Sequence, residues 1–329
     1  MNFWIVDQSS PQVRFSSTGR IALEYTRPPM HGSVAIICSR DWPLAPEIAE
    51  RLRNQGIAGE TLALDAVFQG DAVSVLPDGV VWQGHRLQRF RAVLVERARF
   101  AWPQPQQIER LLEDGAPSRA RVTRERESRS LAISALEVAA ETTRVINHPS
   151  TVHLVVSPAT ALHRLGATGL PVHPWRIQPA PENGDDGLVL DSVGRELRHE
   201  PGRPAVGQPA LLLDAANGEV VSVCMVGRRA AGARLYADGG AWLDGRHSAT
   251  LTAREIAPEV LATAARAAVA LAVDLAVISV HLETQLPTVL FADAGPDLAH
   301  WNRALEGRVG DSLAEHLAVI VAGEEGVEP

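Results

Sequence analysis

The chain has 329 residues, which is enough for two or three lobes around a large core. Its composition is 46% hydrophobic and 21% charged, an ordinary balance for a globular protein. The formal net charge of -8 and the pI near 5.8 argue against a nucleic-acid-binding protein, because such a protein presents a basic face to phosphates.

Lysine is absent from the sequence, so all 31 residues of the Lys and Arg class are arginine. This absence excludes a P-loop lysine, a Schiff-base lysine and a lysine general base. Two explanations stay open. One is a functional loss, and the other is the base composition of a GC-rich genome, which favours arginine over lysine everywhere.

The two cysteines, Cys38 and Cys224, each lie in an apolar run that is typical of a strand. Two buried thiols favour a reducing compartment over a disulfide framework. No N-terminal segment has the basic-then-apolar pattern of a signal peptide. The most apolar run, residues 260–280, contains Arg266 and Asp274, which predicts a buried helix followed by a strand. We therefore expect a cytoplasmic protein with no membrane span.

Residues 1–32 are predicted to form an N-terminal extension with a strand or hairpin near 21–25. An α/β lobe follows over residues 33–146. Its expected elements are a strand at 34–38, a helix ending at Asn54, a strand at 60–65, a hairpin over 73–82 and a strand at 92–95. The order strand, helix, strand implies a parallel sheet with a right-handed crossover.

Residues 147–329 are predicted to form a second, larger unit, with a β-rich segment over about 175–236. Helices at 108–112 and 123–143 and a strand at 145–147 are expected between the strands of the first lobe and this unit. Within the unit we expect a helix at 158–167, a helix ending at 273, strands at 275–282 and 288–292, and a C-terminal helix. Thr252 with Glu255, and Ser312 with Glu315, have the spacing of capping boxes that open the last two long helices.

Several motifs resemble those of known enzymes when they are taken in order. Asn147-His148-Pro149, a helix, and then Gly169-Leu170-Pro171 resemble the entry to the central domain of ribosomal-protein glutamate ligases and of graspetide (microviridin-type) peptide ligases. Residues 223–228 and 290–298 resemble two later motifs of the same enzymes. The chain thus resembles the ATP-grasp superfamily over residues 33–329.

The resemblance implies an α/β fold. A pre-ATP-grasp lobe is followed by a central and lid subdomain rich in β-structure, and then by a C-terminal α+β subdomain. Gln178, in Ile177-Gln178-Pro179, falls where these ligases carry a nucleotide-binding lysine. Gly184 and Gly187 resemble the glycines of their flexible loop. A second lysine position falls on Pro158, which offers no side-chain donor.

The resemblance also places catalytic positions on residues that lack the chemistry. These ligases have a three-residue motif that begins with Asp and ends with an Arg near the transferred phosphate. It falls on residues 220–222, which are Val-Val-Ser. The three magnesium ligands fall on Ser279, Phe291 and Asp293. A hard cation needs several oxygen ligands in tight geometry, and phosphoryl transfer depends on metal and cations to neutralise charge. No shift of the alignment places both the Glu and the Asn ligand of these enzymes on residues that can bind magnesium.

An alternative site built from arginines stays open. Arg164 on the central helix and Arg176 beside the loop are candidates to bind phosphates, and Asp293 is the candidate metal ligand, with Asp297 or Asp274 as helpers. The histidines do not occur at metal-ligand spacing, and no nucleophile elbow or dinucleotide-binding motif is present. The seven scattered tryptophans include candidate interface anchors.

From these observations we expect a pseudoenzyme that keeps the fold and serves as a binding or scaffold protein. Its partner would be a peptide or protein, for example an active paralogue or a second copy of the chain, and no cofactor is expected. The N-terminal extension is a candidate docking strand. The alternative is a divergent carboxylate–amine ligase that uses ATP and Mg²⁺. A weaker alternative is a cleft that binds a small ligand without chemistry.

Overall fold

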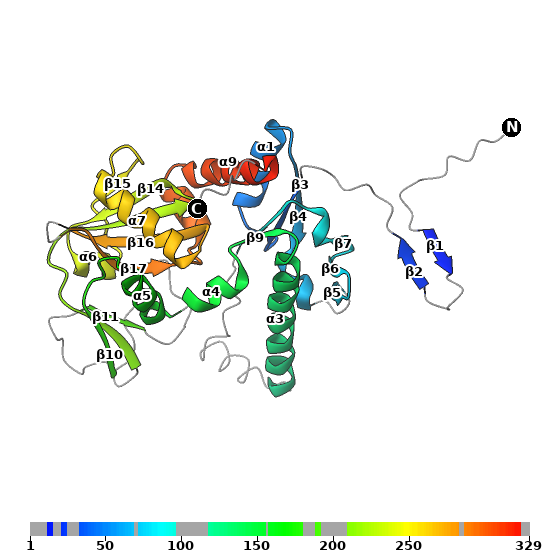
Figure 1. Ribbon diagram of the computed structural model, residues 1–329, viewed down its shortest axis with the longest axis horizontal. Helices are drawn as coiled ribbons and strands as arrows, with labels where there is room; N and C mark the ends of the chain where they lie inside the picture. Colours follow the sequence, from blue (N-terminus) through cyan, green and yellow to red (C-terminus); the bar gives the residue numbers. More distant parts are fainter. Residues whose placement is uncertain are drawn as a thin grey trace.

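The computed structural model describes residues 12–15, 21–24, 33–68, 72–96, 118–155, 157–179, 188–191, 209–282 and 286–323. The expected helix at 108–112 and the two loop glycines, Gly184 and Gly187, lie outside these residues. Two lobes lie side by side in the molecule (Figure 1). Near the N-terminus, strands β1 (Gln12–Phe15) and β2 (Ile21–Glu24) pair as an antiparallel hairpin.

The first lobe is built on a parallel sheet with the strand order β4-β3-β8-β9. Its strands are β3 (Ser33–Cys38), β4 (Ala58–Ala63), β8 (Ala92–Val95) and β9 (Arg144–Ile146). Every residue of β3 and β8 is buried, as expected for a parallel strand covered on both faces. The predicted strand–helix–strand unit with parallel pairing is therefore confirmed.

Helices α1 (Leu44–Asn54) and α3 (Ser118–Ala140) pack on the lobe through two separate apolar clusters. The α3 cluster also contains the predicted hairpin, formed by β5 (Val73–Leu76) and β6 (Gly79–Trp82). The remaining elements are β7 (His85–Arg86) and the short 3-10 helices η1 (Leu64–Phe68) and η2 (Leu87–Arg89).

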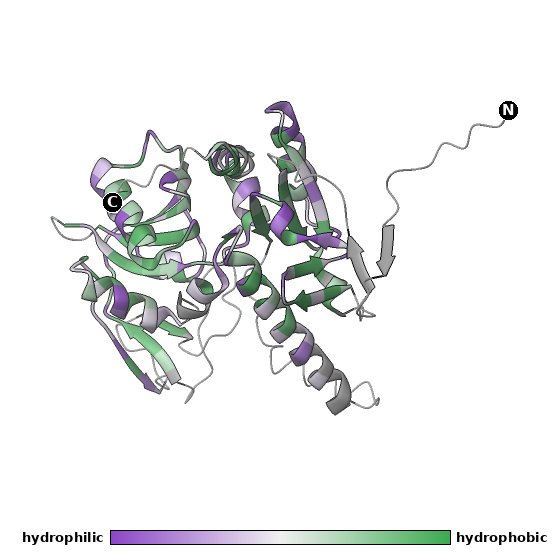
Figure 2. Ribbon diagram, turned by 45° about the vertical axis from the view of Figure 1, so that its right-hand side comes forward, coloured by the Kyte–Doolittle hydropathy of each residue, from purple (hydrophilic) through white to green (hydrophobic). Residues whose placement is uncertain are grey.

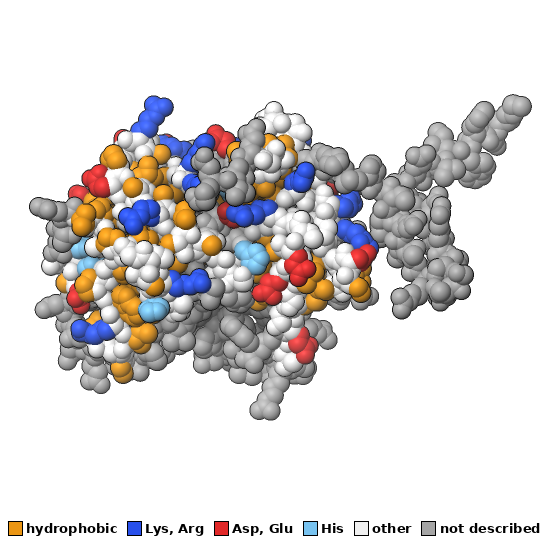
Figure 3. All heavy atoms as spheres, in the orientation of Figure 1, with side chains coloured by type: hydrophobic (Ala, Val, Ile, Leu, Met, Phe, Trp, Pro, Cys, Tyr) orange, Lys and Arg blue, Asp and Glu red, His pale blue; other side chains and the backbone are white. Residues whose placement is uncertain are grey.

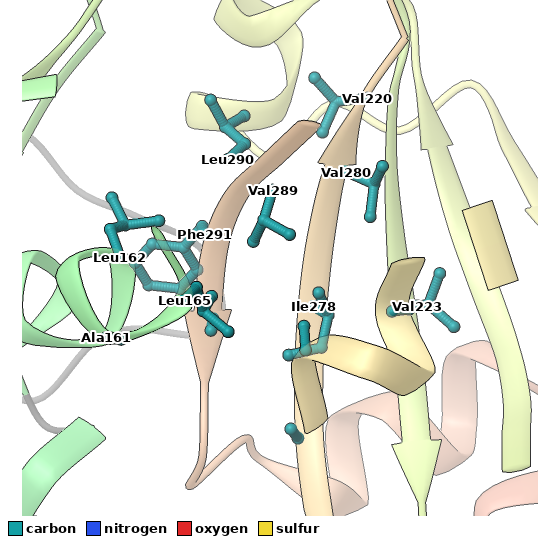
Figure 4. Packing of buried hydrophobic residues seen from close by; sticks show 14 of the residues in the cluster. Ala161, Leu162, Leu165, Val220, Val223, Ile278, Val280, Val289, Leu290 and Phe291 are labelled. Carbon is teal, nitrogen blue, oxygen red and sulfur yellow. The ribbon is translucent and has the colours of Figure 1, made fainter. Parts of the chain in front are cut away.

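The second lobe contains a five-stranded antiparallel sheet with the order β15-β14-β13-β16-β17. Its strands are β13 (Val220–Val226), β14 (Arg229–Tyr236), β15 (Ala249–Leu251), β16 (Leu275–His281) and β17 (Thr288–Asp293). The apolar cluster around α5 (Pro158–Ala167) and α7 (Pro258–Leu271) includes residues of β13, β16 and β17. Leu162 and Leu165 of α5 approach Val289 and Phe291 of β17 (Figure 4).

A smaller sheet with the order β10-β12-β11 adjoins this lobe, formed by β10 (Trp175–Pro179), β11 (Leu188–Asp191) and β12 (Pro209–Leu213). The predicted β-rich range of 175–236 therefore spans two sheets, because residues 220–236 belong to the five-stranded one. The other helices of the lobe are α4 (Pro149–Val155), α6 (Gly239–Leu243), α8 (Leu298–Ala304) and α9 (Arg308–Ala322).

Two predicted helix starts differ from the observed ones. Helix α7 begins at Pro258, although the backbone N–H of Thr252 does donate to the Glu255 carboxylate at 2.6 Å in the turn before it. Helix α9 begins at Arg308, one turn before Ser312, because Gly307 adopts a left-handed conformation (φ 88) that starts the helix there. The second capping-box prediction is therefore wrong.

Hydrophobic residues are concentrated in the strands of the central sheet of each lobe (Figure 2), and they form the buried clusters of the core. The thiols of Cys38 and Cys224 are free and buried, as the sequence predicts. Burial raises the pKa of Cys38 to about 11, with a further upward contribution from the Glu96 charge, and it raises the pKa of Cys224 to about 12. Among the described residues, none of the helices combines the length and the apolar character needed to cross a membrane.

Asn147 joins the two lobes. It follows β9 of the first lobe, and its side chain is 2% exposed. Its amide nitrogen donates to the carbonyls of Leu275 at 2.6 Å and Ala294 at 2.7 Å. Its amide oxygen accepts from the backbone N–H groups of Asp274 and Leu275, both at 2.7 Å. One side chain thus pairs four backbone groups of the second lobe.

A second set of contacts joins α1 to the helices of the other lobe. The Arg51 guanidinium donates to Asp311 on α9 and to Glu47 one turn earlier on α1. The Glu47 carboxylate also accepts from the Asn302 amide at 3.2 Å, and the Asn302 oxygen accepts from Gly310 N–H at 2.8 Å. These polar contacts lie beside an apolar cluster shared by α1, α8 and α9.

We predict that Asn147→Ala lowers the free energy of unfolding by at least about 3 kcal/mol, because it leaves four buried backbone groups without their partners. Urea denaturation followed by circular dichroism measures the loss. Asn54→Ala, at an exposed position at the end of α1, is the matched control and should change stability by less than about 0.5 kcal/mol. Equal losses in the two variants would contradict the joining role of Asn147.

Asp274 lies at the same junction and carries an ion pair with Arg144 of the first lobe at 2.7 Å. Burial alone would raise the pKa of Asp274, but a hydrogen bond from His316 and the charge of Arg144 outweigh it and lower the pKa below its ordinary value. Asp274 therefore stabilises the fold above the unfolded-state pKa of about 3.9, and this contribution is lost as pH falls through the lower folded-state pKa.

We predict that the stability difference between wild type and Asp274→Asn is constant from neutral pH down to about pH 4 and shrinks below it. Urea denaturation at a series of pH values measures this difference. Arg144→Gln removes one cause of the lowered pKa of Asp274. In an Arg144→Gln background, the stability difference caused by Asp274→Asn should therefore change less with pH. A stability difference between wild type and Asp274→Asn that stays constant down to pH 2 would contradict the lowered pKa of Asp274.

Candidate functional site

The strand register brings the expected catalytic positions side by side. Ser222 on β13 lies opposite Ser279 on β16, and Ser279 lies opposite Phe291 on β17. Arg234 on β14 lies opposite Ser222 on the other side. The sheet therefore places Ser222, Ser279 and Phe291, which the sequence singles out as site positions, next to one another.

The side chains at these positions form a buried neutral cluster together with Trp242 of α6. The hydroxyls of Ser222 and Ser279 are 2.7 Å apart, and the Trp242 indole N–H donates to Ser279 Oγ at 3.1 Å. The rings of Trp242 and Phe291 meet edge to face, with 5.6 Å between centroids. All four residues are at most 4% exposed. We call them the Trp242 cluster.

The Trp242 cluster does not fit a magnesium ion. Hard cations take six or more oxygen ligands, mostly carboxylates and water, in a nearly fixed geometry. This cluster supplies two hydroxyls that bond to each other, an indole and a phenyl ring. Over the residues that the structure covers, no group of three or more His, Cys, Asp or Glu side chains is placed to hold a metal. The arrangement is typical of a packed core with its polar atoms satisfied.

Asp293, the candidate metal ligand, is 7% exposed at the end of β17. Its carboxylate accepts from Gly295 N–H at 2.9 Å and so closes the turn that leads to α8. Asp297 caps α8 in the same way, by accepting from His300 N–H at 2.9 Å. Both contacts are typical of carboxylates that shape turns and helix starts.

The structure places the candidate nucleotide-binding residues on two elements. Arg176 and Gln178 lie two residues apart on β10, and the Arg176 Nε–H donates to Gln178 Oε1 at 3.2 Å. Arg164 lies in the last turn of α5, about 9 Å along the helix axis from Pro158 at its start. The start of α5 consists of the Ser157 N-cap, whose hydroxyl accepts from Thr160 N–H, and the buried Pro158.

Arg234 is a residue that the sequence reading missed. It is 3% exposed, its guanidinium donates to His300 Nε2 at 2.6 Å, and it lies 4.8 Å from the centroid of the Trp301 ring. An arginine within the otherwise apolar run Ala230–Tyr236 is the available signal in the sequence. Trp242 was missed too, since the sequence reading predicted no helix at α6, and it is a core residue and not an exposed anchor.

Two histidines lie between the sheets: His173 just before β10 of the small sheet, and His281 at the end of β16 in the five-stranded sheet. His173 and His281 are both buried, with ring centroids 5.0 Å apart and planes at 89°. His173 Nε2 is 2.9 Å from the Asp214 carbonyl, and Gly218 N–H donates to His281 Nε2 at 3.1 Å. Both rings are thus packed, and they stabilise the connection between the two sheets.

Comparisons with known proteins show the fold. No protein-family model matches the sequence, and a search of curated proteins finds no match. Among solved structures, the chain is similar to the ATP-grasp ligase PsnB complexed with the precursor peptide PsnA2 and AMPPNP, with 18% identity, a TM-score of 0.62, and coverage of 90% of this chain and 99% of that one.

Two further structures give the same picture. A Chryseobacterium gregarium RiPP-associated ATP-grasp ligase, in complex with ADP and a leader and core peptide, has 12% identity and a TM-score of 0.59 over 87% of this chain and 96% of that one. The macrocyclase MdnC from Microcystis aeruginosa MRC, bound with the precursor peptide MdnA, has 11% identity and a TM-score of 0.61, with coverage of 88% and 99%. The chain has an ATP-grasp fold, as predicted.

We predict that Phe291→Ala lowers the free energy of unfolding by about 3–5 kcal/mol, because the ring is part of the core and its removal leaves a cavity. Thermal and urea denaturation measure the effect. Val269→Ala on α7, where the side chain is 58% exposed, is the control and should cost less than about 0.5 kcal/mol. A loss below about 1 kcal/mol at Phe291 would mean that the position faces an open site.

Proposed function

We propose that this chain is a non-catalytic protein of the ATP-grasp fold that binds a peptide or protein partner. The observation that carries the proposal is the Trp242 cluster, in which neutral, packed side chains occupy two of the three positions that the resemblance assigns to metal ligands. Phosphoryl transfer is accelerated almost entirely by positioning and by charge neutralisation from metal ions and cations. A site without those charges has little means to stabilise the transition state.

The candidate nucleotide-binding residues support the same proposal. Gln178 presents a neutral amide where the similar ligases carry a lysine, and it is engaged by Arg176. The buried Arg234 guanidinium is held by His300 and Trp301. Solved structures with this fold contain a precursor peptide or a leader and core peptide, and this supports a peptide as the partner of this chain.

A divergent carboxylate–amine ligase is the second candidate, and one observation favours it. Arg176 is exposed on β10 and could offer its guanidinium to a phosphate in place of a lysine. Nucleotides are present in the complexes of PsnB with AMPPNP and with Mg and ADP. This candidate requires that Arg176→Ala and Asp293→Ala each abolish ATP-dependent turnover.

We predict no binding heat when ATP and Mg²⁺ are titrated into the purified chain, and no rise in its melting temperature. A ligand at 100 times its dissociation constant would stabilise the fold by about 2.7 kcal/mol, so a functional site would be visible in a thermal shift. Mg²⁺-dependent binding that Arg176→Ala removes, followed by peptide-dependent ADP release, would overturn the proposal in favour of the ligase.

A further inference from the structure

A cavity of about 350 Å³ lies at the junction of the two lobes, away from the Trp242 cluster. Its volume is within the range of small-ligand pockets, roughly 300–1,000 Å³. It is lined by the segment from Ala140 to Val145 that connects α3 to β9, by His148, and by Ala272 and Asp274 between α7 and β16. We call it the junction pocket. In Figure 3 a histidine and acidic side chains lie close together between the lobes.

The charges around the junction pocket favour a cation. Two carboxylates, Glu141 and Asp274, line it, against one guanidinium, Arg144. Arg144 is paired with Asp274 at 2.7 Å. Glu141 is exposed, and its carboxylate forms no ion pair with any residue in the described part of the chain. The pocket therefore keeps one carboxylate whose charge nothing in this part of the molecule neutralises.

Two helix ends add to the negative electrostatic potential of the pocket. Helix α3 ends at Ala140 and α7 ends at Leu271, and both C-termini are directed at the pocket lining. The C-terminus of a helix carries a partial negative charge from its unpaired carbonyl groups. Carboxylates and helix ends thus contribute the same sign, and they do so from both lobes. The methyl groups of Ala140 and Ala272 provide an apolar wall beside these charges.

We propose that the junction pocket binds a basic side chain, lysine or arginine, of the peptide partner. A long basic side chain has the matching form, because its alkyl stem packs on apolar surface while its charged head reaches carboxylates. Glu141 belongs to the first lobe and Asp274 to the second, so the bound cation contacts both lobes at once. This inference rests on the proposed function and adds to it the chemistry of the partner.

The test uses the full chain and three synthetic hexapeptides of the form acetyl-(Ala-X)3-amide, in which X is lysine, norleucine or glutamate. Fluorescence anisotropy of labelled peptides measures binding at low salt. The lysine peptide should bind at least tenfold more tightly than the norleucine peptide, and the glutamate peptide should not bind. n-Butylamine at the same amine concentration should compete at least tenfold more weakly than unlabelled lysine peptide.

Glu141→Gln is the decisive variant, and we predict that it lowers the affinity for the lysine peptide at least fivefold. Glu137→Gln, at an exposed position one turn earlier on α3 and outside the pocket lining, changes the net charge equally and should leave binding within twofold of wild type. Carbodiimide cross-linking gives a second readout, because a chain without lysine offers no ε-amine of its own. The lysine peptide should become linked to Glu141.

Equal binding by wild type and Glu141→Gln, or equal weakening by both glutamine variants, would overturn the pocket assignment. Equal binding of the lysine and norleucine peptides would show that the pocket does not select a cation. Full competition by n-butylamine would show that the pocket binds a small amine and not a peptide side chain. These failures leave the non-catalytic assignment standing. ATP turnover by the pure chain would instead remove the proposed function itself.

Discussion

The relation between the two lobes depends on the side chain of Asn147. A primary amide has two N–H donors and an oxygen with two lone pairs, and here each finds a backbone partner in the other lobe. The site is buried, so water cannot replace any of these partners. The start of β16 and the loop after β17 are thereby held against the end of β9. The placement of the five-stranded sheet against the first lobe, and with it the junction pocket, depends on this position.

The Trp242 cluster shows that the geometry of this sheet does not require metal ligands. The register of β13, β16 and β17 comes from backbone pairing and from apolar side chains, and neither depends on metal ligands. Carboxylates buried without a cation would repel each other and lose solvation. Two serines, a phenylalanine and an indole that donates to Ser279 avoid that cost. The same backbone is therefore stable without the ion.

The sequence predicts the parts of this molecule that depend on local pattern. Continuous apolar runs located β3 and β8, the Pro-Asp-Gly turn located the β5–β6 hairpin, and ordered motifs predicted the ATP-grasp fold, which the solved structures confirm. The sequence also identified Ser279 and Phe291 as positions without ligand chemistry. It missed Trp242 because that ring reaches the sheet from a short helix, α6, through contacts 37 and 49 residues apart in sequence. Arg234 was missed for a similar reason, since its partners lie on α8.

Whatever the origin of the lysine-free composition, its structural consequence can be followed residue by residue. Arg51 contacts Glu47 and Asp311 through different nitrogens, and Arg234 donates to His300 while it lies over Trp301. A planar guanidinium can make such contacts in two directions, whereas an ammonium is a single compact charge. The arginines at these positions, with Arg144 at the junction, are thus committed to structure. The Glu141 carboxylate at the junction forms no ion pair with any described residue, which leaves it available to a cation from outside the chain. The chain has no lysine of its own to compete for it.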